Sequence, residues 1–224
     1  MNHYEEIVKS RHSVRKFTDK KIEGEVLEKL QEEIASCNQE SGLNIQLAVN
    51  ESKAFGEGHY GSFENCQNYI ALIGDKDDEK LDEKCGYYGE KIVIKMQELG
   101  INSCWVAMTY KKKEVPFTIK DNEKLLIVIA AGYGVTQGSS HKMKEFDKVS
   151  KTKENVAPEW YKKGVEFALY APTAINQQQF LFELDGENQV SAKAKFGPCS
   201  KIDLGIVKYH FELGAGRENF EWKK

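Results

Sequence analysis

The sequence predicts an α+β protein. Three observations lead to this fold class: apolar residues recur at helical spacing in several segments, shorter apolar runs have the pattern of strands, and the order of these segments begins again in the last third of the chain. The 224 residues suffice for one large domain or for two small lobes that share a core.

The first helix and the first strands follow from the spacing of apolar residues. This spacing predicts a helix over 23–36, and Gly42 interrupts the pattern. Residues 45–49 alternate between apolar and polar side chains, as a half-buried strand does. Residues 69–73 form another short apolar run, which predicts a further strand.

A buried helix and a central strand come next. Residues 92–99 predict a mostly buried helix that ends at Gly100, because glycine suits the left-handed conformation at a helix C-terminus. We expect a loop over 103–107. Residues 125–131 form the longest apolar run and predict the central strand, which residues 132–134 end.

The last third of the chain has a similar order. Residues 138–153 are polar and basic, which predicts a linker or loop. A helix is expected over 159–170, an alternating strand over 180–184 and a final helix over 206–214.

Two pairs of segments match across the halves. Ser41–Gln46 aligns with Thr173–Gln178, and Ile92–Gly100 aligns with Ile206–Gly214. The two offsets differ because the second copy is shorter, and we expect it to lack a counterpart of the 69–73 strand. On these identities alone, chance similarity between two helix–turn–strand units is the slightly better explanation.

Composition and charge exclude several classes of protein. The chain is 40% apolar and 30% charged, as ordinary folded proteins are, and its net charge of -3 gives no basic footprint for nucleic acid or an acidic membrane. The N-terminus lacks the apolar core of a signal peptide, and the longest apolar run is too short to span a bilayer. Five cysteines without a Cys-x-x-Cys pair argue against a disulfide framework or a metal site, and suit a reducing cytoplasm.

The most informative stretch of the chain is Arg11-His12-Ser13-Val14-Arg15-Lys16-Phe17. It places two guanidinium groups and a hydroxyl within five residues. A guanidinium can donate to a phosphate in bidentate fashion, and a serine hydroxyl can complete the contact. A solvated basic turn is the alternative interpretation of the same residues.

Three motifs together resemble the nitroreductase family. They are Arg-His-Ser-x-Arg-x-Phe over 11–17, Leu-Gly-x-x-x-Cys-Trp over 99–105, and Ala-Pro-Thr-Ala-x-Asn-x-Gln over 171–178. The resemblance implies a central, mostly antiparallel sheet flanked by helices and a bound flavin mononucleotide (FMN). It also implies an enzyme that takes hydride from NADH or NADPH and passes electrons to a small-molecule acceptor, such as a nitroaromatic or a quinone. Because the flavin carries the chemistry, we assign no catalytic side chain.

The resemblance also implies a fused, internally duplicated chain. Typical nitroreductases are homodimers in which one subunit supplies the basic motif and its partner supplies the Ala-Pro turn. Here the intact motif lies in the first half and the intact turn in the second, while Asn38-Gln39 stand where the first half would carry Ala-Pro. We therefore expect a pseudo-dimeric monomer with one flavin between a lobe of residues 1–150 and a shorter lobe of residues 151–224; a further homodimer stays possible.

The same resemblance assigns roles around the flavin. Arg11 and Ser13 would bind the phosphate, and Arg15 would lie near N1 and the C2 carbonyl. The loop after Gly134 would supply a second phosphate contact, and a backbone N–H from the loop over 103–107 would reach N5. The candidate cofactor-binding residues are Arg11, His12, Ser13, Arg15, Trp105, Val106, Ala107, Lys142, Lys144, Pro172, Thr173, Ala174, Asn176 and Gln178.

Several of these residues have ordinary structural explanations as well. Asn176 could bond its own turn, Pro172 could simply stop a helix, Trp105 could be a core residue, and the two lysines could be surface charges. Two other functions also fit the resemblance: a flavin-binding sensor without catalysis, and a reductive dehalogenase on the same scaffold.

Overall fold

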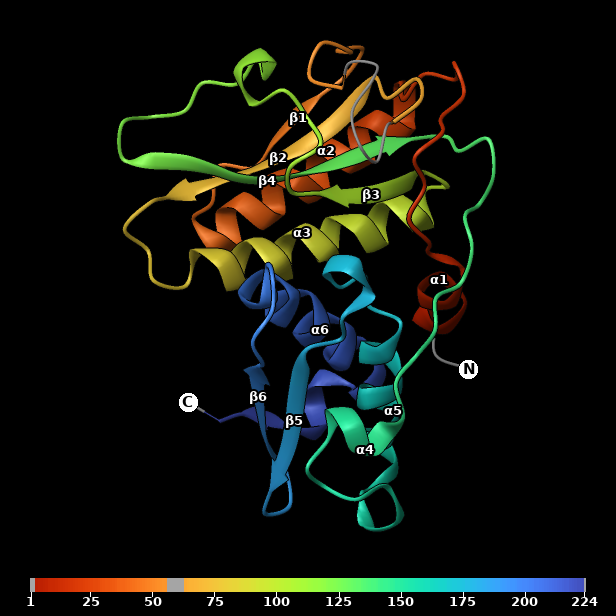
Figure 1. Cartoon of the computed structure of the whole chain (residues 1–224), viewed down its shortest axis with the longest axis vertical. Coiled ribbons are helices and arrows are strands. Elements are labelled where there is room, and N and C mark those ends of the chain that lie inside the picture. The colour runs from red at the N-terminus through yellow and green to blue at the C-terminus, as the bar shows by residue number, and fades with distance from the viewer. Residues whose placement is uncertain (1–2, 56–62, 224) are drawn as a thin grey trace.

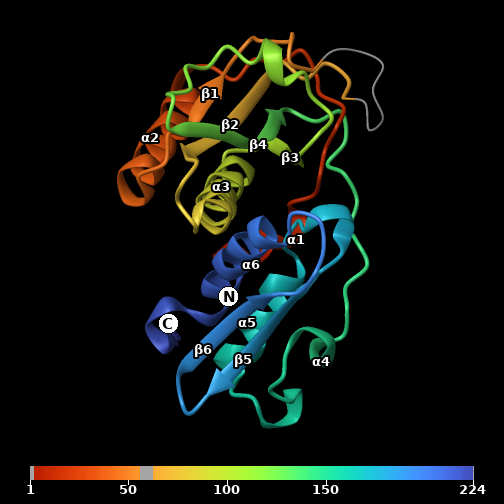
Figure 2. The same ribbon diagram turned by 60° about the vertical axis from the view of Figure 1, so that its left-hand side comes forward.

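Two helices, α3 (Leu81–Glu98) and α6 (Ser200–Ala215), lie against each other at the middle of the molecule and separate two bodies of secondary structure (Figures 1 and 2). The structure is a computed structural model that describes residues 3–55 and 63–223. It confirms the α+β fold class, with each body carrying its own sheet.

The first body contains a four-stranded antiparallel sheet in the order β1-β2-β4-β3. Its strands are β1 (Gln46–Ala48), β2 (Asn68–Asp75), β3 (Asn102–Val106) and β4 (Glu123–Gly132). The two central strands are almost wholly buried, which is why their sequences are continuous apolar runs rather than alternating ones. Helices α2 (Gly24–Ser41) and α3 lie on one face of the sheet (Figure 2).

The second body contains α5 (Glu159–Leu169), α6 and a three-stranded sheet of β5 (Phe180–Asp185), β6 (Gln189–Ala194) and β7 (Glu221–Trp222). Strands β5 and β6 are antiparallel, and β7 runs parallel to β6. Aromatic rings fill its core: the rings of Phe182 and Phe211 lie 4.7 Å apart, and Phe211 also meets Tyr161.

The remaining elements are short helices and single turns. Helix α1 (Tyr4–Ser10) packs on α3 and α6, and the segment after β4 runs down the side of the molecule to α4 (Phe146–Val149) (Figure 1). Single turns of 3-10 helix span Lys112–Glu114, Glu154–Val156, Ala174–Asn176 and Arg217–Asn219. Within the described part of the chain, no helix combines the length and apolar character that crossing a membrane requires.

The close approach of α3 and α6 depends on two glycines. A Cβ at Gly86 would collide with the carbonyl oxygen of Ile202, and a Cβ at Gly205 would collide with the carbonyl oxygen of Glu83. Each glycine therefore contacts a backbone carbonyl of the facing helix, and that carbonyl lies about one helical turn before the facing helix's own glycine. This reciprocal contact is the relation that a two-fold axis between the helices would produce.

Three expectations about the elements were wrong. Residues 102–106 form strand β3 instead of a loop, because β4 supplies backbone partners from a distant part of the chain. After β5 the second half forms a further strand, β6, where we expected none. Helix α6 continues to Ala215 and is capped by Gly216, with φ +77°, so it ends past the expected end at Gly214.

The structure explains why Asn38-Gln39 stand where the family motif would place Ala-Pro in the first half. Helix α2 continues through both residues to Ser41, whereas Pro172 follows closely after the end of α5. Asn38 then closes the following turn from inside the helix: its Oδ1 accepts from the Ile45 N–H at 2.7 Å, and its Nδ2 donates to the Ile45 carbonyl at 2.9 Å.

Candidate functional site

The basic N-terminal motif and the turn after α5 meet in one cavity of about 280 Å³. The two segments are more than 150 residues apart, and the segment after β4 completes the wall between them. The residues lining the cavity are Arg11, His12, Ser13, Arg15, Ser139, His141, Pro172, Thr173, Ile175 and Asn176.

The N-terminal motif is an extended segment anchored to the first sheet. Ser13 pairs with Ser103 of β3, and the Val14 N–H donates to the Ser103 carbonyl at 3.0 Å. The side chains of Val14 and Phe17 are buried in the core. Four polar residues of the motif, at positions 11, 12, 13 and 15, line the cavity, whereas Lys16 is exposed and pairs with Glu64.

Arg11 is a buried cation with an unmatched donor. Its side chain is only 3% exposed, and its Nη2 donates to the Tyr170 carbonyl at 3.4 Å. Its Nε has no hydrogen-bond partner among the described residues and lies 4.0 Å from Glu90 Oε1. Burial lowers the pKa of Arg11, and Glu90 opposes that shift. Arg11 is also one of the residues that line the cavity, so its guanidinium is a candidate donor to an anion there, although Glu90 already offsets part of its charge.

Glu90 connects the motif to the centre of the molecule. This fully buried carboxylate accepts from Trp105 Nε1 at 2.8 Å and lies 2.8 Å from His210 Nε2. The other ring nitrogen of His210 lies 3.1 Å from the Phe167 carbonyl. Glu90 thereby ties together β3, α6 and the segment that carries Arg11.

The turn after α5 has a strained backbone. Ile175, Asn176 and Gln178 have φ angles of +47°, +54° and +46°. Residues other than glycine rarely adopt these angles, and a β-branched residue such as isoleucine does so least readily. Ile175 is also 87% exposed at the cavity.

The carboxamides of this turn are bonded to the loop after β4. Asn176 Nδ2 and Gln178 Nε2 donate to the Lys142 carbonyl at 2.9 and 2.8 Å, and the Lys144 N–H donates to Gln178 Oε1 at 2.8 Å. The Lys144 ammonium donates to the carbonyls of Gln177 and Gln178 at 2.7 and 3.0 Å. Neither Lys142 nor Lys144 lines the cavity, contrary to the expectation of a phosphate contact there.

The cavity brings together seven of the residues that the sequence singled out: Arg11, His12, Ser13, Arg15, Pro172, Thr173 and Asn176. The other seven lie outside its lining: Trp105, Val106, Ala107, Lys142, Lys144, Ala174 and Gln178. Trp105 points its indole N–H to Glu90, Val106 is buried at the end of β3, and Ala107 is exposed beside it.

Three lining residues escaped the sequence analysis: Ser139, His141 and Ile175. His141 Nε2 lies 2.9 Å from the Leu169 carbonyl, so this nitrogen carries the proton and donates. Burial lowers the pKa of His12, and Arg11 and His141 add to the shift. In the sequence, His141 directly precedes Lys142, and we expected Lys142 and Lys144 to contact the phosphate. Only the path of the loop places His141 at the cavity instead of these lysines.

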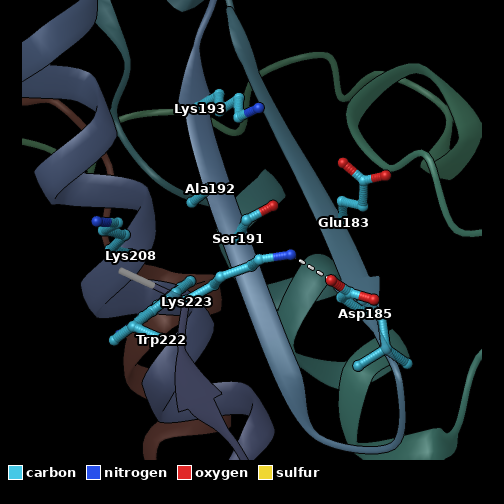
Figure 3. Close-up of a pocket in the computed structure, with 9 residues that line it drawn as sticks. Glu183, Asp185, Ser191, Ala192, Lys193, Lys208, Trp222 and Lys223 are labelled. Carbon is cyan, nitrogen blue, oxygen red and sulfur yellow. Dashed lines mark hydrogen bonds and ion pairs between the residues drawn. The ribbon is translucent and has the colours of Figure 1, made fainter.

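A larger cavity, of about 440 Å³, lies beside β5 and β6 (Figure 3). Its cations are mostly paired within the protein. Lys223 binds Asp185, and Lys208 binds Glu83 and lies 5.2 Å from the centre of the Trp222 ring. This cavity is therefore a weaker candidate for an anionic ligand. Across residues 3–55 and 63–223, we find no group of three or more side chains able to hold a metal ion.

The fold and the cavity define an α+β protein with a cationic site between two bodies. Residues 3–215 match the family model described as "Putative TM nitroreductase", so the chain belongs to this nitroreductase family. The resemblance seen in the sequence is thereby confirmed at the level of the family. Membership makes an oxidoreductase the general functional class. No curated protein matches the chain.

Solved structures agree on the fold. A "putative nitroreductase" of Thermotoga maritima is 22% identical, covers 97% of this chain and 85% of its own, and has a TM-score of 0.66. A "putative nitroreductase in complex with FMN" from Desulfovibrio desulfuricans is 15% identical over 66% of this chain and 96% of its own, with a TM-score of 0.55. A "putative NADH dehydrogenase/NAD(P)H nitroreductase" of Parabacteroides distasonis is 16% identical over 66% and 97%, with a TM-score of 0.52.

Proposed function

We propose that this protein is an FMN-dependent oxidoreductase that takes hydride from NADH or NADPH and passes electrons to nitroaromatic or quinone-like acceptors. The observation that carries the proposal is that two guanidinium groups, the buried Arg11 and the exposed Arg15, line one cavity. The names of related structures, which include an FMN complex and an NAD(P)H nitroreductase, support the choice of cofactor and reductant.

The cavity residues fit the parts of FMN. Arg11 and Ser13 would hold the phosphate, with His12 and His141 as further donors when protonated. Arg15 is exposed and free to offset negative charge on the flavin. Pro172, Thr173 and Ile175 would shape the wall against the ring. FMN, when bound, supplies the hydride chemistry, so the protein contributes binding, orientation and charge.

The proposal is tested with the purified protein. We expect it to bind FMN, to lose its yellow colour anaerobically on mixing with NADH or NADPH, and to regain the colour with a nitroaromatic or a quinone. Failure to take up FMN would contradict the proposal. Bound FMN that neither nicotinamide reduces would indicate a sensor, and reoxidation by halogenated aromatics alone would indicate a reductive dehalogenase.

We also propose that the chain is a fused pseudo-dimer with one flavin site, divided into residues 1–150 and 151–224. Two observations support this: both halves have the order helix, strand, strand, helix, and α3 and α6 cross reciprocally at Gly86 and Gly205. The measurements are the mass in solution and the FMN content. We expect a monomer with one FMN per chain; two FMN per chain would contradict the proposal.

A further inference from the structure

The turn after α5 owes only part of its shape to bonds among its own residues. Three of its non-glycine residues, Ile175, Asn176 and Gln178, have positive φ angles, which persist only where the surroundings compensate for the strain. Local bonds explain part of the shape: the Gln178 N–H donates to Thr173 Oγ1 at 3.0 Å. The rest must come from other elements.

Asp203, in the first turn of α6, holds the beginning of this turn. Its two carboxylate oxygens accept from the Ala174 N–H at 3.0 and 3.1 Å, and Oδ2 also accepts from Gln177 Nε2 at 2.7 Å. The residue is only 2% exposed, and no cation forms an ion pair with it among the described residues. A buried carboxylate without a counter-ion is expensive, so its bonds to the turn compensate for its burial.

Lys144, from the loop after β4, holds the end of the same turn. Its ammonium donates to the carbonyls of Gln177 and Gln178, and its backbone N–H donates to the Gln178 side chain. Gln177 is thus bonded from both elements, through its side chain by Asp203 and through its carbonyl by Lys144.

We propose that Asp203 and Lys144 are positioning residues that clamp the strained turn in the shape that forms one wall of the cofactor cavity. Neither side chain lines the cavity, so both act through Thr173, Ile175 and Asn176, which do. The predicted effect on flavin binding rests on the function proposed above, whereas the predicted effect on the turn itself does not.

The test compares FMN with riboflavin, which lacks the phosphate. For Asp203→Ala and Lys144→Met, we expect the Kd of both flavins to rise by the same factor, about 10-fold or more, because the ring wall is displaced while the phosphate contacts stay. Lys144→Arg retains a cationic donor and should restore most of the affinity. If Lys144→Met weakens FMN but leaves riboflavin unchanged, Lys144 contacts the phosphate and the clamp is wrong.

Hydrogen exchange in the flavin-free protein supplies a second readout. We expect the peptide spanning residues 171–179 to exchange about 10-fold faster in both variants, with the rest of the chain unchanged. Asp203→Asn, which keeps the size and one acceptor oxygen, replaces Asp203→Ala if the latter does not fold. The matched controls are Asp185→Asn and Lys151→Met, whose side chains are exposed in ion pairs on the second sheet and should change neither readout.

The outcomes separate the two proposals. If the wild-type protein binds neither flavin, the proposed function is wrong. Hydrogen exchange alone then tests whether Asp203 and Lys144 hold the turn. If the wild-type protein binds flavin and the variants match it in affinity and exchange, the clamp is wrong while the proposed function stands.

Discussion

Glu90 and His210 meet inside the molecule, with Oε1 and Nε2 2.8 Å apart and both side chains fully buried. They come from α3 and α6, the two helices at the junction of the bodies. The same carboxylate binds the Trp105 indole and lies 4.0 Å from Arg11 Nε. These contacts therefore support the segment that carries Arg11, and we expect their loss to lower the free energy of unfolding.

Glu90→Ala should lower the free energy of unfolding by about 3–5 kcal/mol. The substitution leaves His210 and Trp105 buried without their common partner and removes the carboxylate nearest to Arg11, and breaking a buried pair on one side has costs of this size. Urea denaturation at neutral pH measures the change. Glu154→Ala, at an exposed position, is the control and should stay within about 0.5 kcal/mol of the wild type; an equal loss in both variants would contradict the role of Glu90.

Arg11→Ala should weaken FMN binding by about 1.5–3 kcal/mol, the usual value of a hydrogen bond to a charged group. Riboflavin, which has no phosphate, should bind to the variant and the wild type alike. Titration of flavin fluorescence gives both affinities. Unchanged FMN affinity would remove Arg11 from the phosphate site, and an equal loss for riboflavin would show that the substitution disturbs the whole cavity.

Asp203 should make the stability of the protein depend on pH. Burial raises the pKa of Asp203 to about 6, although the bonds from Gln177 and Ala174 act in the opposite direction. The folded protein therefore holds this proton more tightly than the unfolded chain, where an aspartate titrates near pH 3.9. Its stabilising contribution is complete below about pH 4 and is lost as the pH rises through about 6.

The measurement compares the wild type with Asp203→Asn, which cannot titrate. Between about pH 3 and about pH 7, the wild type should lose on the order of 3 kcal/mol relative to the variant, and the difference should be constant above about pH 7. A difference that does not change across this range would show that Asp203 titrates normally.

Gly86→Ala and Gly205→Ala should each destabilise the protein by about 1–3 kcal/mol or more. A methyl group at either position meets a backbone carbonyl of the facing helix, and backbone cannot move aside as a side chain can. Thermal denaturation measures both variants. The control is Glu32→Ala on the exposed face of α2, whose Tm should be close to that of the wild type. Glycine variants with the same Tm as the wild type would contradict a close crossing of α3 and α6.

Local pattern was enough to predict much of this protein. The spacing of apolar residues identified α2, α5 and the central strands β2 and β4, because a helix or a buried strand imposes its own period on the sequence. The motifs over 11–17 and 171–178 identified the family and pointed to two segments that line one cavity. The chemistry of guanidinium groups and carboxamides is visible in residue type alone.

Contacts between distant residues decided the rest. Strands β3, β6 and β7 are short and carry weak patterns, and their backbone bonds come from strands elsewhere in the chain. The loop after β4 offers His141, Lys142 and Lys144 within four residues, and only its path over the turn places the histidine at the cavity and Lys144 on the turn. Glu90 and His210, 120 residues apart, become partners only because α3 and α6 pack closely at two glycines. Residue type limits which bonds a side chain can make, whereas packing decides which partner it meets.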